Sequence, residues 1–228
     1  AAVRGETLPF LSFFVSKLKW FKVSQLRAGL SFFKDQGVEH VIMAGHISQR
    51  NLFNPAIQAD PELKAFFSAL RDRKADTIFG AVADFLDTAG LKVLDSTLLL
   101  KRFLAREGVL SLRLPTESEL TDIEFGKVIA KTMGRLDVGQ TVVIKEKAII
   151  AIEAMEGTDQ CILRGGRIAH SGGVVVKTSK PNQDLRFDIP VVGPRTIKSM
   201  IRSRCACLGI EAGKTLIIDE SRCKRLAD

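Results

Sequence analysis

Residues 177–194, KTSKPNQDLRFDIPVVGP, bring together side chains that could act on a phosphate group. Lys177 and Lys180 supply ammonium groups suited to phosphate oxygens, and Gln183 adds a polar side chain close behind them. Prolines at positions 181, 190 and 194 restrict the backbone around these groups. We therefore interpret the segment as the working part of an enzyme that hydrolyses a phosphorylated substrate.

Within this segment, residues 184–189 alternate between charged and apolar side chains. A period of two predicts a β-strand with one charged face and one apolar face. The charged face would carry Asp184, Arg186 and Asp188. Alone, the pattern is more typical of an edge strand whose arginine neutralises two carboxylates. The nearby lysines and Gln183 favour a functional site, in which Arg186 also contacts the substrate.

Asp184 and Asp188 are the candidate catalytic residues. In an extended strand they would lie ~13 Å apart, which is too far for both to bind one metal ion. One carboxylate would hold Mg²⁺ or orient the attacking water while the other pairs with Arg186, unless a turn at Asp184 brings the two together. Asp188 is the preferred candidate, because Asp184 lies nearer the turn expected at residues 181–182.

A second candidate site lies at residues 153–159, where acidic residues precede a short helical run. Thr158 or Asp159 could simply cap that helix, and the pattern alone favours this role. In the functional alternative, the helix N-terminus with Thr158 binds a phosphate group, and Glu156 or Asp159 lies near a metal ion. Residues 137–140, Asp-Val-Gly-Gln, are typical of a turn before a strand.

The first half of the chain alternates helices and strands. Helical spacing of apolar residues predicts helices over residues 24–37 and 75–90, each ending at a glycine and followed by a short strand. This order predicts a parallel sheet with helices on both faces, a Rossmann-like α/β domain whose first strand and loop we expect to precede Ala1. Gly45 and His46 follow one strand, at the edge where such sheets bind ligands, although His46 is more typical of an ordinary loop residue.

The second half predicts a mixed α/β domain. Thr116 opens a capping box before a helix that runs to Gly134, and residues 141–154 give two apolar strands around Glu146 and Lys147. Further strands are expected at residues 174–178, 185–189 and 215–219, and a helix from residue 194 to 208. A helix over residues 98–106 and an irregular stretch at 108–115 come before. We therefore assign residues 1–110 to the first domain and 116–228 to the second.

Composition indicates a soluble protein of the cytoplasm. The chain has 46% hydrophobic and 26% charged residues, its apolar runs are far shorter than the ~20 residues that cross a bilayer, and it opens with no signal-peptide pattern. Its four cysteines lack a disulfide framework, so we expect reduced thiols. A net charge of +8 favours an anionic partner, but only charge supports nucleic acid, and we expect none.

An aromatic stretch at residues 9–21 combines five aromatic side chains with Lys17 and Lys19. Such a stretch could rest on a membrane surface or line a groove for acyl chains. Packing in the protein core is the commoner explanation, and we favour it here.

Three motifs in the second half resemble those of one known family. They are DVGQ at residues 137–140, EGTD at residues 156–159 and K-x-x-K-P-x-Q-D-L-R-x-D-x-P-x-x-G at residues 177–193. In this order they resemble the UDP-2,3-diacylglucosamine hydrolases of lipid A synthesis, a two-domain family. VIMAG at residues 41–45 adds a looser match in the first half.

The resemblance implies a Mg²⁺-dependent pyrophosphatase that cleaves UDP-2,3-diacylglucosamine to UMP and 2,3-diacylglucosamine 1-phosphate. The basic charge also favours a peripheral position on the inner face of the cytoplasmic membrane, where anionic lipids are abundant, and a homodimer is a further partner we consider. The full set of expected site residues comprises catalytic Asp184 and Asp188, substrate contacts from Lys177, Lys180, Gln183, Arg186, Thr158, Gly45 and His46, and metal ligands Asp188, Asp159 and Glu156. A nucleotide-sugar or dinucleotide-binding protein without hydrolytic activity is the alternative.

Overall fold

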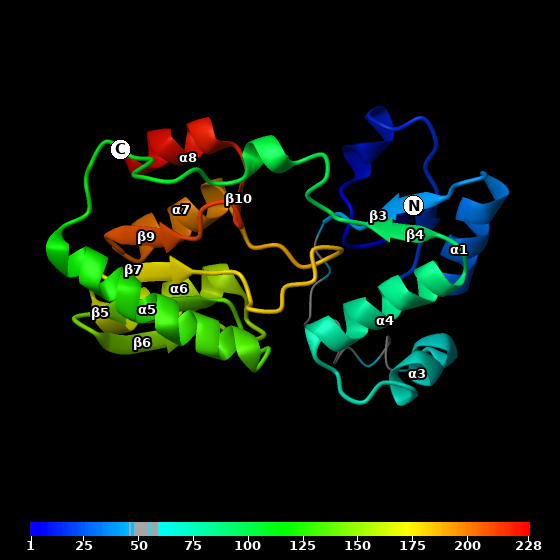
Figure 1. Ribbon diagram of the computed structural model, residues 1–228, viewed down its shortest axis with the longest axis horizontal. Helices are drawn as coiled ribbons and strands as arrows, with labels where there is room; N and C mark the ends of the chain where they lie inside the picture. The colour runs from blue at the N-terminus through cyan, green and yellow to red at the C-terminus, as the bar shows by residue number, and fades with distance from the viewer. Residues whose placement is uncertain (46, 48–54, 56–58) are drawn as a thin grey trace. The chain divides into compact units, whose positions relative to one another are not determined.

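The computed structural model describes residues 1–45, 47, 55 and 59–228 (Figure 1). The chain forms two compact units. The first comprises residues 1–96 together with 184–187, and the second comprises residues 97–183 and 188–228. Both units combine helices with strands, which confirms the expected two-domain α/β architecture.

Two parallel strand pairs and their helices make up the first unit. β3 (His40–Ile42) pairs with β4 (Lys92–Leu94), and β1 (Ala2–Val3) pairs with β2 (Trp20–Phe21). The helices of this unit within the described residues are α1 (Leu26–Asp35), α3 (Pro61–Ser68), α4 (Ala75–Thr88) and the short 3-10 helix η1 (Pro9–Phe13). The helices α1 and α4 and the parallel strands β3 and β4 were predicted and are confirmed. The Rossmann-like character of this unit stays a prediction.

Glycines end both predicted helices of this unit. Gly37, with φ of 64°, follows α1, and Gly90, with φ of 88°, follows α4. This left-handed region favours glycine and lets the chain reverse from helix into strand. The Asp87 carboxylate then accepts a hydrogen bond of 2.7 Å from the backbone N–H of Val93, which ties the end of α4 to β4.

The aromatic stretch at residues 9–21 is largely exposed around η1. Phe13 is 84% exposed and Phe14 is 78% exposed, and η1 has no buried residue. The ring of Phe14 packs edge-on against Phe10 instead of entering the core. The expectation of core packing is therefore wrong for η1, although it holds for Phe21, which is buried. None of the helices in the described ranges has the length and apolar character needed to cross a membrane.

A four-stranded mixed sheet forms the centre of the second unit (Figure 1). Its strands lie in the order β6 (Ala148–Ile152), β5 (Thr141–Lys145), β7 (Val174–Lys177) and β9 (Cys207–Ile210), and β7 and β9 are parallel. A second, parallel pair joins β8 (Val191–Val192) to β10 (Leu216–Ile217). The helices are α5 (Glu117–Arg135), α6 (Thr158–Ala169), α7 (Pro194–Arg202), α8 (Glu220–Ala227) and the 3-10 helix η3 (Lys101–Phe103).

Both faces of this sheet are covered, because successive residues of each strand point to opposite sides. On one face Val142 packs with Ala130 of α5. On the other face Val143 packs with Cys161 of α6 and Met200 of α7. Burial on both faces explains why β5 and β7 are continuous apolar runs in the sequence.

Two sequence signals place the ends of these elements correctly. Thr116 accepts a hydrogen bond from the N–H of Glu119, whose carboxylate accepts one from the N–H of Thr116, so the capping box before α5 is confirmed. The predicted hairpin is confirmed as well, since β5 and β6 are antiparallel and joined through Glu146 and Lys147, both at positive φ. Asp122 of α5 accepts hydrogen bonds from both of these N–H groups and fixes the turn.

The strand predicted over residues 185–189 is wrong. These residues form a turn, in which the N–H of Phe187 donates to the carbonyl of Asp184. The Asp184 carboxylate also accepts a hydrogen bond of 3.0 Å from the N–H of Arg186. Such local bonds compete with pairing in a sheet, and the alternation of charged and apolar residues does not reveal them.

Two predicted helices are also wrong or too long. Residues 98–106 form a turn and η3 instead of an α-helix. The helix that begins at Pro194 ends at Arg202 instead of continuing to residue 208. Arg204 has φ of 52°, which a helix does not allow, and residues 207–210 then form β9 beside β7.

Gly166 is required where α6 meets the turn after α7. A Cβ atom at this position would lie 2.1 Å from Ser203 Cβ and 2.5 Å from the Ser203 carbonyl oxygen. We expect Gly166→Ala to lower the free energy of unfolding by about 3 kcal/mol, because backbone must move to accept the methyl group. Gly80→Ala in α4 is the control, since nothing lies within 4 Å of its Cβ position. It should raise stability by up to about 1 kcal/mol in the same urea titration. A neutral Gly166→Ala would contradict this packing.

Candidate functional site

Polar side chains of the second unit gather where β7 ends and β5 begins. Thr141 of β5 lies opposite Lys177 of β7, and the N–H of Thr178 donates to the carbonyl of Gln140. The parallel strands β7 and β9 both have their carboxyl ends here. Ligands of α/β sheets bind at such edges, so this edge is the candidate site.

Asp188 is held at this edge by a group of side chains that we call the Asp188 cluster, comprising Asp137, Gln140, Lys180 and Asp188. The Nζ atom of Lys180 lies 3.1 Å from Asp188 Oδ2 and 2.5 Å from Asp137 Oδ1. The Nε2 atom of Gln140 lies 3.1 Å from both carboxylate oxygens of Asp188. Lys180 is buried and the Asp188 side chain is 22% exposed. The cluster therefore presents one oriented carboxylate to solvent.

Gln183 closes the loop that carries Asp188. Its side-chain oxygen accepts a hydrogen bond from the N–H of Lys180, and its side-chain nitrogen donates to the carbonyl of Asp188. Both amide positions of Gln183 are thus used within the protein. Gln183, which we expected to contact the substrate, positions the backbone of Asp188 in this structure.

Lys177 is the second cation at this edge, and it is buried. Its Nζ atom donates to Thr158 Oγ1 over 2.7 Å, and Thr158 Oγ1 donates to Glu153 Oε1 over 2.9 Å. No carboxylate lies within ion-pair distance of the ammonium in the described part of the chain. A buried cation without a direct counter-charge is costly, and an anionic ligand would remove that cost.

Three buried oxygen atoms around Lys177 have no hydrogen-bond partner within the described residues. They are Gln140 Oε1, Glu153 Oε2 and Thr178 Oγ1. Buried polar atoms are normally hydrogen-bonded to protein or to ordered water. These atoms are therefore available to water or to polar groups of a ligand at this edge.

The DVGQ turn, which we interpreted only as a turn, supplies two members of the Asp188 cluster. Asp137 has φ of 54°, and Gly139 passes so close to β6 that a Cβ atom would lie 2.1 Å from the carbonyl oxygen of Glu153. This tight path brings Asp137 and Gln140 to Lys180 and Asp188. Sequence reasoning missed Asp137 and Gln140 as site residues, and the presence of DVGQ among the family motifs was the signal for both. Glu153 lies in the second candidate site predicted at residues 153–159.

A second ionic network holds the backbone between Lys177 and Lys180. Lys131 Nζ lies 2.6 Å from Glu211 Oε2 and donates to the carbonyl of Ser179, whose own N–H and hydroxyl donate to Glu211. Burial alone would raise the pKa of Glu211, but hydrogen bonds from Lys131, Lys214 and Ser179 outweigh it and lower the pKa to about 2.

This low pKa predicts how stability changes in acid. A carboxyl group whose pKa is about 2 in the folded chain, against an ordinary 4.5, stabilises the fold above pH 4.5 and loses that contribution as the pH falls toward 2. As the pH is lowered, we expect the free energy of unfolding to fall more steeply in the wild type than in Glu211→Gln. Between about pH 4 and pH 2.5, unfolding of the wild type should take up as many as about one more proton than unfolding of Glu211→Gln. Urea titrations at several pH values measure it, and equal slopes would contradict the network.

Asp184 has different surroundings from Asp188 and belongs to the first unit. Arg186 Nη2 lies 2.8 Å from Asp184 Oδ2, and Arg186 Nη1 lies 3.1 Å from Asp84 and 3.0 Å from Asp87, both on α4. Hydrogen bonds from Arg186 hold the pKa of Asp184 below its usual range. The guanidinium, expected to contact substrate, is thus engaged by three carboxylates of the protein.

The other predicted site residues have other partners in the second unit, belong to the first unit or lie outside the described residues. Glu156 pairs with Arg164 at 2.6 Å, and Asp159 pairs with Arg195 at 3.3 Å. Gly45 is exposed, with φ of 108°, and His46 lies outside the described residues. Across the described residues, no group of three or more His, Cys, Asp or Glu side chains could hold a metal ion.

The Asp188 cluster nevertheless fits a Mg²⁺ ion that is bound mainly by a substrate. Such ions need only one or two protein carboxylates, together with phosphate oxygens and water. Asp188 pairs with Lys180, which also pairs with Asp137, and the Asp188 carboxylate is partly exposed. Of the three predicted metal ligands, Asp188 is the one that this arrangement supports.

Models of known protein families match almost the whole chain. The LpxI N-terminal domain matches residues 1–103, and the LpxI C-terminal domain matches residues 106–228. The chain belongs to the LpxI family. It is similar to the UDP-2,3-diacylglucosamine pyrophosphatase LpxI of Caulobacter vibrioides, with 29% identity over 203 residues that cover 85% of this chain and 72% of the relative. The family expected from the three motifs is confirmed. The Asp188 cluster and Lys177 both lie within the match to the LpxI C-terminal domain.

Proposed function

We propose that this chain hydrolyses the diphosphate of UDP-2,3-diacylglucosamine to UMP and 2,3-diacylglucosamine 1-phosphate, as a step of lipid A biosynthesis. Membership of the LpxI family and the name of the Caulobacter vibrioides relative support the reaction. The observation in this chain that carries the proposal is the buried ammonium of Lys177. It has no direct carboxylate partner among the residues that the structure describes, and it lies on the same sheet edge as the Asp188 cluster.

Each side chain of the site has a role in this proposal. Lys177 binds an oxygen of the diphosphate and stabilises the charge that grows there in the transition state. Asp188 accepts a hydrogen bond from the attacking water, while Lys180 and Gln140 hold the carboxylate in place. The water oxygen forms a bond to one phosphorus and gives up a proton to Asp188, while the bond between that phosphorus and the bridging oxygen breaks and the bridging oxygen leaves on the other phosphate. Asp188, together with the diphosphate, would hold a Mg²⁺ ion, and that ion would supply positive charge against the phosphate oxygens.

Identification of the products tests the reaction directly. The full chain is incubated with UDP-2,3-diacylglucosamine and Mg²⁺, and the products are analysed by mass spectrometry. Equal amounts of UMP and 2,3-diacylglucosamine 1-phosphate are expected. Tight binding of the substrate without any UMP would instead support the nucleotide-sugar-binding alternative, and release of UDP would show that a different bond is cleaved.

We also propose that the chain contacts the membrane that holds its lipid substrate, through the exposed apolar side chains around η1. Leu8 is 62% exposed, and Phe13 and Phe14 are more exposed still. We expect Phe13→Ser/Phe14→Ser to reduce sedimentation with vesicles of phosphatidylcholine and phosphatidylglycerol by about 10-fold, because two inserted rings are lost. Leu112→Ser/Leu114→Ser is the control, since both leucines are exposed but belong to the second unit. Equal losses from the two variants would contradict the proposal.

A further inference from the structure

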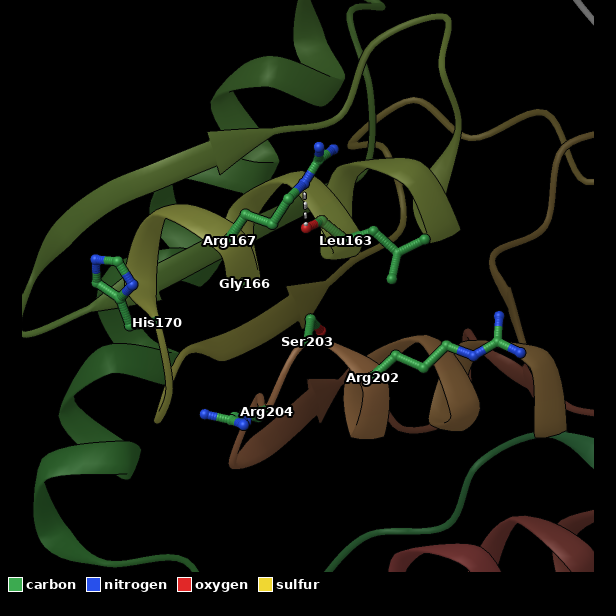
Figure 2. A pocket seen from close by; sticks show the side chains of 7 residues that line it. All are labelled: Leu163, Gly166, Arg167, His170, Arg202, Ser203 and Arg204. Carbon is green, nitrogen blue, oxygen red and sulfur yellow. Dashed lines mark hydrogen bonds between the residues drawn. The ribbon is translucent and has the colours of Figure 1, made fainter.

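A cavity of about 430 Å³ lies at the other end of α6, between the last turn of α6 and the turn that follows α7 (Figure 2). Four basic side chains line it. Arg167 lies in the last turn of α6 and His170 directly follows that helix, while Arg202 ends α7 and Arg204 lies in the turn after it. Volumes of this size are typical of sites for small ligands.

Among the described residues, the three arginines of this cavity have no acidic partner. In the described part of the chain, no carboxylate lies within ion-pair distance of Arg167, Arg202 or Arg204. Four other arginines of the second unit, Arg106, Arg113, Arg164 and Arg195, each lie 3.3 Å or less from a carboxylate oxygen, whereas Arg102, Arg135, Arg222 and Arg225 have no such partner among the described residues. The cavity therefore concentrates positive charge that the protein does not neutralise.

The backbone beneath these side chains is firmly built. Gly166 forms the contact with Ser203 that excludes any side chain at position 166, and the buried Ser203 hydroxyl lies within hydrogen-bond distance of the carbonyls of Ser199 and Met200. The N–H of Gly172 donates to the carbonyl of Arg204. The four basic residues are thus attached to fixed backbone, and their exposed side chains can turn toward a ligand.

Basic residues at the C-terminus of a helix have an ordinary explanation, because they interact favourably with the helix dipole. This accounts for Arg167 and Arg202, which lie in the last turns of α6 and α7. It does not account for His170 and Arg204, which follow the helices. Both occupy the left-handed region, with φ of 61° and 52°, which is costly for residues other than glycine.

We propose that this basic pocket binds the phosphate group of a ligand other than the substrate undergoing hydrolysis. Guanidinium groups bind phosphate oxygens through paired hydrogen bonds, and three arginines are among the residues that line the cavity. The pocket is separate from the candidate site, because Thr158 begins α6 whereas Arg167 lies in its last turn. At 1.5 Å per residue these two positions are roughly 14 Å apart along the helix.

Phosphate binding to a matched pair of triple variants tests the proposal. Inorganic phosphate and glycerol phosphate are titrated at constant ionic strength into full chains carrying Lys177→Met, which removes the ammonium of the candidate site. Adding Arg167→Gln/Arg202→Gln/Arg204→Gln should weaken binding at least about 10-fold. Adding Arg4→Gln/Arg222→Gln/Arg225→Gln removes the same charge from exposed positions elsewhere and should leave binding within about 2-fold. Equal binding by the two triple variants would overturn the proposal.

Two further measurements distinguish a lipid headgroup from a soluble phosphate ligand and test whether the pocket takes part in the proposed hydrolysis. The first measurement is binding to vesicles of phosphatidylcholine with phosphatidylglycerol. If only the variant without Arg167, Arg202 and Arg204 binds these vesicles more weakly, the ligand is a lipid headgroup. If that variant loses glycerol phosphate binding but keeps vesicle binding, the ligand is soluble. Circular dichroism checks folding, and Arg204→Gln alone repeats the test if the triple variant unfolds. The second measurement uses both triple variants with Lys177 kept. Their rates of UMP release should equal that of the wild type, and this comparison does not depend on which product the wild type is found to release.

Discussion

Replacing Asp188 by Asn is expected to lower the rate of UMP release by at least about 100-fold, because the attacking water loses the carboxylate that accepts its hydrogen bond. Asn keeps the shape of the side chain, and Lys180 keeps its ion pair with Asp137 at 2.5 Å. The thermal midpoint should therefore change by less than about 3 °C. The rate of UMP release at saturating substrate, together with a thermal melt, measures both effects.

Asp184→Asn is the matched control for this variant. It makes the same chemical change four residues away, at a carboxylate that pairs with Arg186 and not with Lys180. Arg186 would keep its two contacts to Asp84 and Asp87, so UMP release should stay within about 5-fold of the wild type. A large loss in Asp184→Asn with little change in Asp188→Asn would reverse the assignment of the two carboxylates.

Replacing Lys177 by Met is expected to separate activity from stability. UMP release should fall by about 100-fold or more, because the diphosphate loses a buried cationic donor. The free energy of unfolding should stay within about 1 kcal/mol of the wild type, because a buried ammonium without a direct carboxylate partner contributes little to the fold. Kinetics and urea titration of one variant give both values.

Lys131→Met provides the contrast, because it removes a lysine that the protein does pair. Lys131 lies 2.6 Å from Glu211 and donates to Ser179, so its loss leaves a partly buried carboxylate without its main partner. We expect the free energy of unfolding to fall by about 2 kcal/mol. If Lys177→Met destabilised the protein as much as Lys131→Met, Lys177 would be a structural cation and not a ligand-binding one.

Most regular elements could be predicted because their signals are local. The capping box at Thr116, the glycine that ends α4 at Gly90 and the apolar runs of β5 and β7 each depend on a few neighbouring residues. The errors arose where contacts distant in the sequence decide the structure. Residues 207–210 leave the predicted helix because they pair with β7, which the sequence around them does not indicate.

The candidate site could be predicted only in part, for the same reason. Lys177, Thr158, Lys180 and Asp188 were named from their chemistry, and the structure brings all four to one sheet edge. The partners that orient them come from other parts of the chain, as Gln140 and Asp137 do from a turn more than forty residues earlier. The turn at residues 184–187 was hidden because its alternating residues suit a strand equally well.

A structure of the Asp188→Asn variant with UDP-2,3-diacylglucosamine bound is the most direct test of the site. Slow hydrolysis in this variant would preserve the substrate long enough to be observed. We predict a diphosphate oxygen about 3 Å from Lys177 Nζ and a phosphorus atom facing the side chain at position 188. A diphosphate bound away from both residues, for example in the basic pocket lined by Arg167 and Arg204, would contradict the proposed catalytic site.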